Sequence, residues 1–342
     1  MKTRRTFLFG SVIAGFLALG ASAYAMVQIN AAGATFPAAI YQKWFEKFKT
    51  AHPDDQINYQ AIGSGGGVRQ LTEGTVDFGA SDFPLTDEQI AKITKYHVLH
   101  FPTVMGGVVP TYNVEGVSTD LKFTGQLLAN IFSAKISKWN DAEIAKVNPG
   151  VKLPSTDIVV VHRSEGSGTT FVFTDFLSTV SPDWKNKIGK GPTVSWPSGL
   201  GAKGNEGVAG QVKQTPGAIG YVELFYAIQN KMPFGAVQNQ AGKFLKASLE
   251  SVTEAAAGAA KSMPADFRVS IVNAPGANAY PLSTFTWLLI PDSIPDAGKK
   301  KAIVEFLHWM LTTGQNDAAP LSYAPLPKSV IAKEEAQIAK IH

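Results

Sequence analysis

Apolar residues recur along this chain with two spacings, which predict helices and strands in alternation. Between residues 37 and 49 they fall three or four apart, and this predicts an amphipathic helix with Trp44 and Phe48 on its buried face. The same spacing predicts helices at 123–132, 170–177, 205–213 and 297–313, and a helix that opens at 68–71. Short apolar runs predict strands at 57–62, 76–80, 98–104, 158–161, 218–222 and 285–290.

The repeated order of strand, loop and helix predicts an α/β fold. Such a chain is expected to form mostly parallel sheets that are covered by helices. The stretch 239–262 gives the weakest pattern, and because it is rich in Ala, Gly and Lys we interpret it as a surface excursion. With 342 residues, the chain is long enough for two domains of ordinary size.

The first 25 residues have the three-part pattern of a secretory signal peptide. A basic start with Lys2, Arg4 and Arg5 precedes an apolar run at 7–20. The Ala-Tyr-Ala at 23–25 offers the small residues that a signal peptidase requires. The apolar run is shorter than the ~20 residues that span a bilayer, so a cleaved signal is favoured over a membrane anchor. We predict cleavage after residue 25 and export.

The adjacent Arg4 and Arg5 leave two export routes open, the general secretory (Sec) route and the twin-arginine route. The chain contains no cysteine, which excludes disulfides, cysteine-based metal sites and a lipid anchor on a signal-peptide cysteine. We therefore expect a soluble protein in the periplasm of a bacterium with two membranes.

The net charge of +4 comes largely from the predicted signal. Three of the 31 basic residues and none of the 27 acidic residues lie in residues 1–25, so the remainder carries about +1. A broad basic surface for nucleic acid or membranes is therefore not expected. If the protein binds an anion, it must do so with a local site.

Three turns of glycine and other small residues stand directly before predicted helices. They cover residues 33–37, 63–68 and 163–170, and each offers hydroxyl groups or glycine backbone. The first turn of a helix has N–H groups without an internal partner and a partial positive charge, which suit phosphate, sulfate or carboxylate. For any single turn, ordinary helix capping is the better explanation. A binding site requires that the three turns converge in space.

Two charged residues follow predicted strands, where ligands bind in α/β proteins. Arg163 offers a planar fork of donors that can hold two anion oxygens, although it could instead be a surface residue paired with Glu165. Asp82 would repel an anion unless the ligand has a proton to donate, which hydrogen phosphate has and sulfate lacks at neutral pH. The alternative for Asp82 is a cap on the turn before Pro84.

An enzyme that acts on phosphate esters is the main alternative to a binding protein. The turn at 63–67 lacks the Gly-Lys-Ser/Thr ending of a Walker loop, and no serine of these turns lies in a Gly-x-Ser-x-Gly elbow. His97 and His100 have no carboxylate cluster beside them, so we expect no metal site. Catalysis would depend on serine, Arg163 and Asp82 alone, and we therefore expect no enzyme. An extracellular interaction protein with the same fold is a further alternative.

Six segments together resemble the periplasmic phosphate-binding proteins of phosphate-specific ABC transporters. They are AAGATFP (31–37), IGSGGGVRQL (62–71), VDFGASDFPL (76–85), FPTVMGGVVP (101–110), HRSEGSGTTFVFTDFL (162–177) and PGAIGYVE (216–223). The resemblance implies a two-lobed periplasmic binding protein fold, with the ligand between lobes that are each a mostly parallel sheet flanked by helices. It assigns 26–105 and 281–342 to lobe I and 106–280 to lobe II.

The resemblance also implies a set of site residues. Phosphate would be bound by Thr35, Phe36 (through its backbone N–H), Ser64, Asp82 (as proton acceptor), Arg163, Ser167, Gly168 and Thr169. Glu165 stands where some relatives carry Asp and would orient Arg163. The implied partners are inorganic phosphate and the transmembrane permease subunits of a phosphate ABC importer, with no cofactor, no metal and no nucleic acid. We expect a monomer that closes around the anion and delivers it for uptake.

Overall fold

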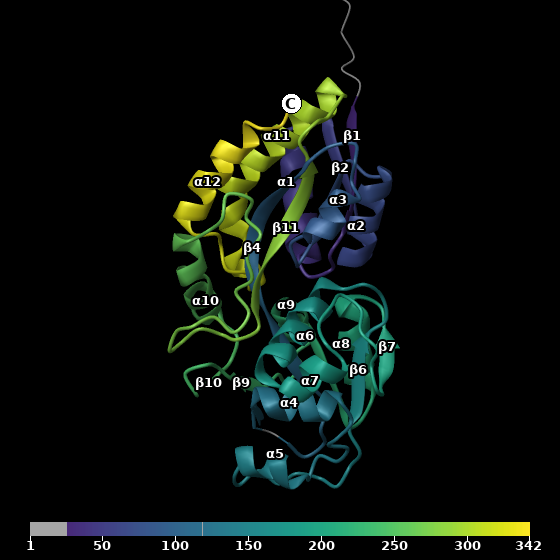
Figure 1. The fold of residues 1–342 in the computed structure, drawn as a ribbon, viewed down its shortest axis with the longest axis vertical. Coiled ribbons are helices and arrows are strands. Elements are labelled where there is room, and N and C mark those ends of the chain that lie inside the picture. The colour runs from purple at the N-terminus through teal and green to yellow at the C-terminus, as the bar shows by residue number, and fades with distance from the viewer. Residues whose placement is uncertain (1–25, 118) are drawn as a thin grey trace, which may run out of the picture.

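The computed structural model describes residues 26–117 and 119–342, which form two bodies stacked along the long axis (Figure 1). The predicted signal at 1–25 lies outside the described residues. The larger sheet has eight strands in the order β2-β1-β3-β11-β4-β8-β6-β7. Their bounds are β1 Val27–Gly33, β2 Asp55–Ala61, β3 Phe78–Ser81, β4 Val98–Tyr112, β6 Val159–Arg163, β7 Leu200–Ala202, β8 Ala218–Glu223 and β11 Ser283–Pro291. A smaller sheet, in the order β10-β9-β5, comprises β5 Lys122–Phe123, β9 Ala236–Gln238 and β10 Phe244–Leu245.

Strand β4 belongs to both bodies. Its residues 98–107 pair antiparallel with β11, and its residues 108–112 pair antiparallel with β8. The neighbours β1 and β2, β1 and β3, β6 and β7, and β6 and β8 pair in parallel. The three antiparallel pairs of this sheet all involve β4 or β11. The protein thus has a two-lobed α/β architecture in which the sheet is mixed only around these two strands.

Helices cover the sheets of both bodies. The helices are α1 Ala38–Ala51, α2 Ser64–Glu73, α3 Asp87–Ala91, α4 Gly125–Phe132, α5 Ala142–Val147, α6 Gly168–Val180, α7 Pro182–Lys187, α8 Gly204–Gln214, α9 Leu224–Gln229, α10 Leu249–Lys261, α11 Ala297–Thr312 and α12 Lys328–Ile338. In Figure 1, α1, α2, α3, α11 and α12 surround the upper strands, and α4 to α8 surround the lower ones. Aromatic residues fill the core of each body: Phe48 of α1 meets Phe306 of α11 edge-on, and Phe173 of α6 stacks on Tyr221 of β8.

Every helix and strand predicted from the apolar pattern is present, and α2 and β4 extend furthest beyond their predicted bounds. Helix α2 begins at Ser64, inside the glycine turn, and not at 68. Strand β4 continues beyond residue 104 to Tyr112, through Gly106 and Gly107. In both places the glycines lie inside the element, where the sequence pattern favours a turn.

The interpretation of 239–262 as a surface excursion is wrong for its second half. Helix α10 begins with a capping box between Ser248 and Ser251 and buries one face against β4, β11 and α12. Alanines such as Ala255 and Ala256 supply most of this face, so the contrast between apolar and polar positions is small. Helix α10 belongs to the segment assigned to lobe II, whereas β11 and α12 belong to the segment assigned to lobe I. Helix α10 therefore packs across the predicted boundary between the lobes, and the lobe bounds stay a prediction.

Among residues 26–117 and 119–342, no helix combines the length and the apolar content needed to cross a membrane.

Candidate functional site

Parallel pairing brings three strand ends of the upper body to one edge of the sheet. Gly33 at the end of β1 pairs with Ala61 of β2 and with Ala80 of β3, so these strands end at the same level. The turns that follow carry Thr35, Ser64 and Asp82. Gly33 has a positive φ of 155°, and a Cβ at this position would lie 2.1 Å from the carbonyl oxygen of Ala80. Only glycine therefore allows the strands to approach this closely beneath the site.

The lower body contributes the end of β6 and the start of α6. Strand β6 ends at Arg163, and α6 begins at Gly168 after a short turn. Ser167 is the N-cap of α6, and its Oγ accepts a hydrogen bond from the backbone N–H of Thr170 at 3.1 Å. This cap orients the first turn of α6 toward the upper body.

The turns of the two bodies are in direct contact. The backbone N–H of Gly168 donates to Ser64 Oγ at 3.1 Å, and that of Gly65 donates to the carbonyl oxygen of Gly166 at 2.9 Å. A Cβ on Gly168 would lie 2.5 Å from Ser64 Oγ and 2.5 Å from the Cβ and Oδ2 of Asp82. The backbone N–H groups of Ile62 and Gly63 donate to the carbonyl oxygen of Gly33 at 3.0 and 2.9 Å, so the first turn joins the other two. The three helix-preceding turns therefore converge, as an anion site requires.

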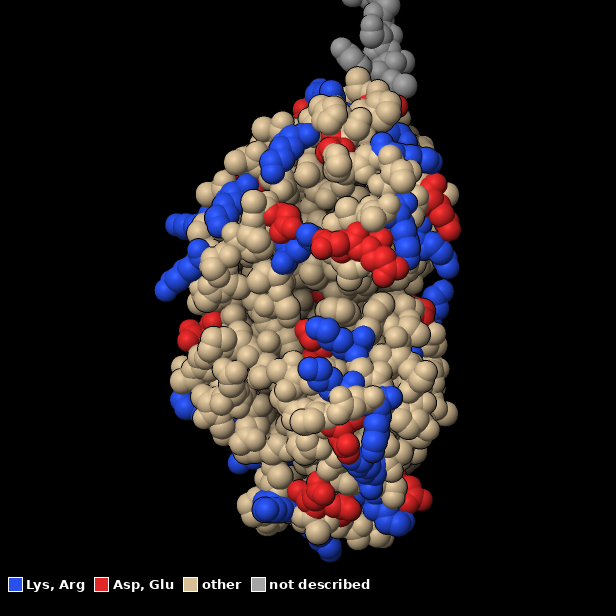
Figure 2. Space-filling view, viewed as in Figure 1, with Lys and Arg blue, Asp and Glu red and all other residues tan. Residues whose placement is uncertain are grey.

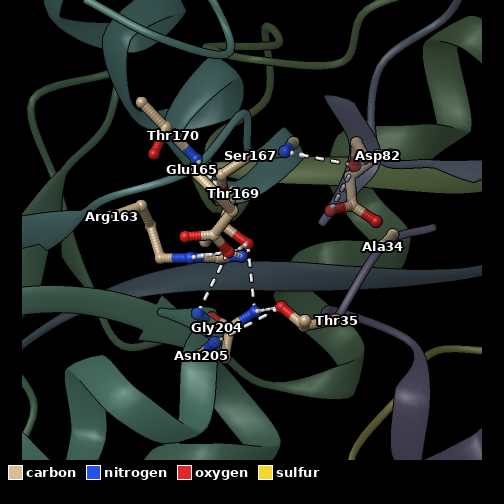
Figure 3. A network of polar contacts seen from close by, with 12 residues as sticks. Ala34, Thr35, Asp82, Arg163, Glu165, Ser167, Thr169, Thr170, Gly204 and Asn205 are labelled. Atoms are coloured by element: carbon tan, nitrogen blue, oxygen red, sulfur yellow. Dashed lines mark hydrogen bonds and ion pairs between the residues drawn. The ribbon is translucent and has the colours of Figure 1, made fainter. Parts of the chain in front are cut away.

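Arg163 is a buried residue and not a surface one. Its side chain is 1% exposed, and its guanidinium forms an ion pair with Glu165 through Nε (3.0 Å) and Nη2. Nη1 donates to Thr169 Oγ1 at 3.2 Å. The same Glu165 oxygen accepts the backbone N–H of Gly204 at 3.0 Å, and Figure 3 shows how this carboxylate fixes the plane of the guanidinium. The geometry agrees with an orienting role for Glu165.

Asp82 does not cap the turn before Pro84. That turn is closed by Ser81, whose Oγ lies 3.2 Å from the backbone nitrogen of Phe83 and donates to its carbonyl oxygen at 2.6 Å. The Asp82 carboxylate instead accepts a hydrogen bond from Thr286 Oγ1 of β11 at 2.9 Å, and Ser64 Oγ lies 3.4 Å from its Oδ2. Burial raises the pKa of Asp82 to about 7, although Thr286, Arg163 and Ser64 each act to lower it.

The segment around Thr35 and Phe36 is held by tyrosines from elsewhere in the fold. Tyr226 of α9 donates its hydroxyl to the carbonyl oxygen of Thr35 at 2.6 Å, and Tyr323 donates to that of Phe36 at 2.7 Å. The Phe36 ring is fully buried against the core. Because both carbonyls are fixed, the backbone N–H groups of this turn have a fixed direction.

All eight residues predicted as ligands are buried at this junction, and Glu165 lies partly buried beside them. They are Thr35, Phe36, Ser64, Asp82, Arg163, Ser167, Gly168 and Thr169. Their contact with phosphate stays a prediction.

His97 and His100 lie outside the site. The ring of His100 accepts a hydrogen bond from the backbone N–H of Leu85 at 3.1 Å, and burial lowers the pKa of His100 to about 4.

Sequence reasoning missed two polar residues of this network. Asn205 at the start of α8 contacts Thr35 and Thr169, and Thr286 contacts Asp82 (Figure 3 shows Asn205 between the two bodies). A signal existed for Asn205, because it opens the predicted helix at 205–213 directly after Gly204, as glycine residues precede helices in the three turns. Thr286 lies inside a predicted apolar strand, where no local signal marks it.

The arrangement can bind a small anion that also carries a proton. Its donors are the guanidinium of Arg163, several hydroxyls and N–H groups at the starts of α2 and α6, of which those of Gly65 and Gly168 here donate to atoms of the facing turn. Asp82 supplies the one carboxylate among the predicted ligands, and an ionised carboxylate can only accept hydrogen bonds. On the face shown in Figure 2, acidic and basic side chains are interspersed, which agrees with an anion site that depends on local geometry.

Among the described residues, one group of side chains has the spacing of a metal site. His52, Asp55 and Glu305 place ligand atoms within 4.8 Å of one another. They lie at the end of α1, the start of β2 and on α11, and none of them belongs to the network around Arg163 and Asp82. The predicted ligands themselves form no such group.

Comparison with known proteins agrees with this geometry. A family model described as a PBP superfamily domain matches residues 20–313. The phosphate-binding protein PstS of Xylella fastidiosa (strain Temecula1) is 47% identical over 311 residues, which cover 91% of this chain and 84% of the relative. PstS of Haemophilus influenzae is 42% identical over 323 residues, which cover 94% and 96%.

Solved structures support the same fold. The phosphate-binding protein from Stenotrophomonas maltophilia superposes with a TM-score of 0.71 at 20% identity, covering 91% of this chain and 93% of that one. A high-affinity periplasmic phosphate-binding protein (PfluDING) bound with phosphate gives a TM-score of 0.71 at 22% identity, with the same coverage. Given the family model and the identity to relatives over most of both chains, this protein belongs to the PstS family of phosphate-binding proteins, within the PBP superfamily.

Proposed function

We propose that this protein binds inorganic phosphate in the periplasm and delivers it to an ABC importer, without catalysis. The observation that carries the proposal is the convergence of Arg163, three helix-preceding turns and Asp82 in one buried network. The relatives named phosphate-binding protein PstS support it, since they match over most of the chain.

Asp82 gives the proposal its chemical selectivity. A buried carboxylate beside a cation and several donors would repel an anion with no proton. Hydrogen phosphate can donate its proton to Asp82 in a short charge-assisted hydrogen bond, whereas sulfate has no proton at neutral pH. The Asp82 carboxylate thus selects phosphate because its charge repels every anion that has no proton to donate to it.

The two-lobed form suggests how capture works. Donors come from both bodies, so the anion can be surrounded fully only when the bodies are in contact, and ligand would shift the population toward this closed state. We assign 26–105 and 281–342 to lobe I and 106–280 to lobe II. The closed form would then dock on the transmembrane permease subunits as a monomer.

Export completes the proposal. The signal-like pattern at 1–25 would direct the chain across the inner membrane by the Sec or the twin-arginine route, and cleavage would release it into the periplasm as a soluble protein.

The test is isothermal titration of the mature protein with phosphate, arsenate and sulfate in parallel. The protein is first unfolded, freed of bound anion and refolded, because co-purified phosphate would hide the affinity. We expect tight binding of phosphate and weak or undetectable binding of sulfate. Equal affinity for phosphate and sulfate, or no binding of either by refolded protein, would reject the proposal. Substitution of Asp82 by Asn should narrow the preference for phosphate over sulfate.

A further inference from the structure

Asn205, in the first turn of α8, is a fully buried residue that links the two bodies. Its Oδ1 accepts the backbone N–H of Glu223 at 2.9 Å. Its Nδ2 donates to Thr35 Oγ1 of the upper body at 2.9 Å and to Thr169 Oγ1 of the lower body at 3.1 Å. The orientation of the amide is fixed, because the backbone N–H of Glu223 can only donate and must face an oxygen.

A count of donors and acceptors shows what this does to the two threonines. A hydroxyl has one proton to donate and two lone pairs that accept. Thr35 Oγ1 receives both Nδ2 and the backbone N–H of Asn205, the latter at 3.3 Å. Thr169 Oγ1 receives Asn205 Nδ2 and Arg163 Nη1. With both lone pairs taken, each hydroxyl can only donate to its next partner.

We propose that Asn205 is the positioning residue that makes Thr35 and Thr169 obligate hydrogen-bond donors toward the ligand. Two hydroxyls that could serve as donor or acceptor are thereby committed to an anion. Because Thr35 and Asn205 lie in different bodies, the commitment of Thr35 arises only when the bodies are in contact, whereas Thr169 and Asn205 belong to the same body. The inference rests on the proposed function, in which the ligand is phosphate.

The decisive variant is Asn205→Asp, which keeps the shape but removes both side-chain donors. The new carboxylate would accept from both hydroxyls and turn their protons away from the ligand. We expect phosphate affinity to fall at least about 100-fold, since a buried charge and two lost donors act together. Asn205→Ala avoids the buried charge and should reduce phosphate affinity at least about 10-fold. The reduction should come mainly from faster dissociation, because the contact between Asn205 and Thr35 forms after the anion has entered.

Asn239 supplies a matched control. It is also buried, and its Nδ2 donates to the backbone carbonyls of Gly276, Ala277 and Ala279, away from the site. Asn239→Asp should reduce the unfolding free energy and leave the phosphate dissociation constant within about twofold of the wild type. Affinities are measured by titration calorimetry and dissociation rates by stopped flow, on refolded phosphate-free protein with the fold checked by circular dichroism.

A double-mutant cycle separates positioning from general support of the fold. In a Thr35→Val, Thr169→Val background, Asn205→Ala has no hydroxyls to orient and should cost less than about threefold in affinity. The same 10-fold loss in both backgrounds would overturn the inference. So would phosphate binding by Asn205→Asp or Asn205→Ala within about threefold of the wild type. Failure of the wild-type protein to bind phosphate is a different result, and it would reject the proposed function together with this role.

Discussion

Replacement of Asp82 by Asn should change the pH dependence of stability in ligand-free protein. The Asp82 side chain is buried at the junction of the two bodies, and burial raises its pKa from 3.8 to about 7. The hydrogen bonds from Thr286 and Ser64 and the charge of Arg163 oppose this rise without cancelling it. Asparagine has nearly the same shape and no ionisation, so the substitution removes the titration and little else.

The sign follows from proton linkage. Between pH ~4 and pH ~7 the native carboxyl holds a proton that the unfolded chain has released, so wild-type stability falls as pH rises through this window. The rise of the pKa from 3.8 to about 7 corresponds to at most about 4 kcal/mol, at about 1.4 kcal/mol for each pKa unit. Partial opening of the lobes rehydrates the carboxylate, so we expect about 2–4 kcal/mol of this effect in the measured free energy of unfolding. Between pH 4.5 and pH 8, the free energy of unfolding of Asp82→Asn should therefore rise by that amount relative to the wild type.

The assay is urea unfolding of both proteins at intervals from pH 4.5 to pH 8.5 in phosphate-free buffer. Other titrating groups, including His100, are common to both proteins and cancel in the difference. The control is Asp317→Asn, which removes a buried aspartate that pairs with Lys43 and Lys47 and should destabilise the protein at pH 8. Added phosphate should reverse the order at pH 8, because only the wild-type carboxylate can accept the phosphate proton.

A stability difference that stays constant across this pH range would refute the reasoning, because it would mean that Asp82 titrates alike in native and unfolded protein. A difference that shrinks as pH rises would show that the native fold favours the ionised carboxylate.

Three further substitutions test other parts of the site. Arg163→Ala should weaken phosphate binding by more than about 2 kcal/mol in calorimetry, and a smaller loss would show that Arg163 does not hold the anion. Gly168→Ala places a methyl group 2.5 Å from Ser64 Oγ and should block closure, seen as at least about 100-fold weaker binding with little change in unfolding free energy. Replacement of Arg4 and Arg5 by Lys should stop export, measured by cell fractionation, only if the twin-arginine route is used.

The local parts of the site were predictable from sequence because each depends on neighbours along the chain. Glycine before a helix, a hydroxyl at a cap and a charge at a strand end are short-range patterns, and they marked Ser64, Asp82 and Arg163. The same logic failed within β4, where Gly106 and Gly107 suggest an end to the strand. There a Cβ on Gly106 would lie 2.6 Å from the Phe36 ring, so the glycine serves a tertiary contact and not a turn.

The partners that complete the site were not predictable, because they come from distant parts of the chain. Thr286 is 204 residues from Asp82, and Asn205 is 170 residues from Thr35. Periodicity reports which face of an element is buried, but not which polar side chain will meet another across a fold. Helix α10 shows the same limit for packing, since its alanine face becomes a core face only through α12 and β11.

Charge balance explains why such distant contacts matter. Arg163 is already paired with Glu165, and Asp82 adds a second acid, so the site has no surplus positive charge when the anion arrives. Attraction must come from oriented N–H and O–H dipoles, which act strongly in a buried, water-poor place and which folding has aligned in advance. Each such dipole is useful only if its direction is fixed. A protein with almost no net charge after residue 25 can therefore hold an anion, provided that residues such as Asn205 decide which way its hydroxyls point.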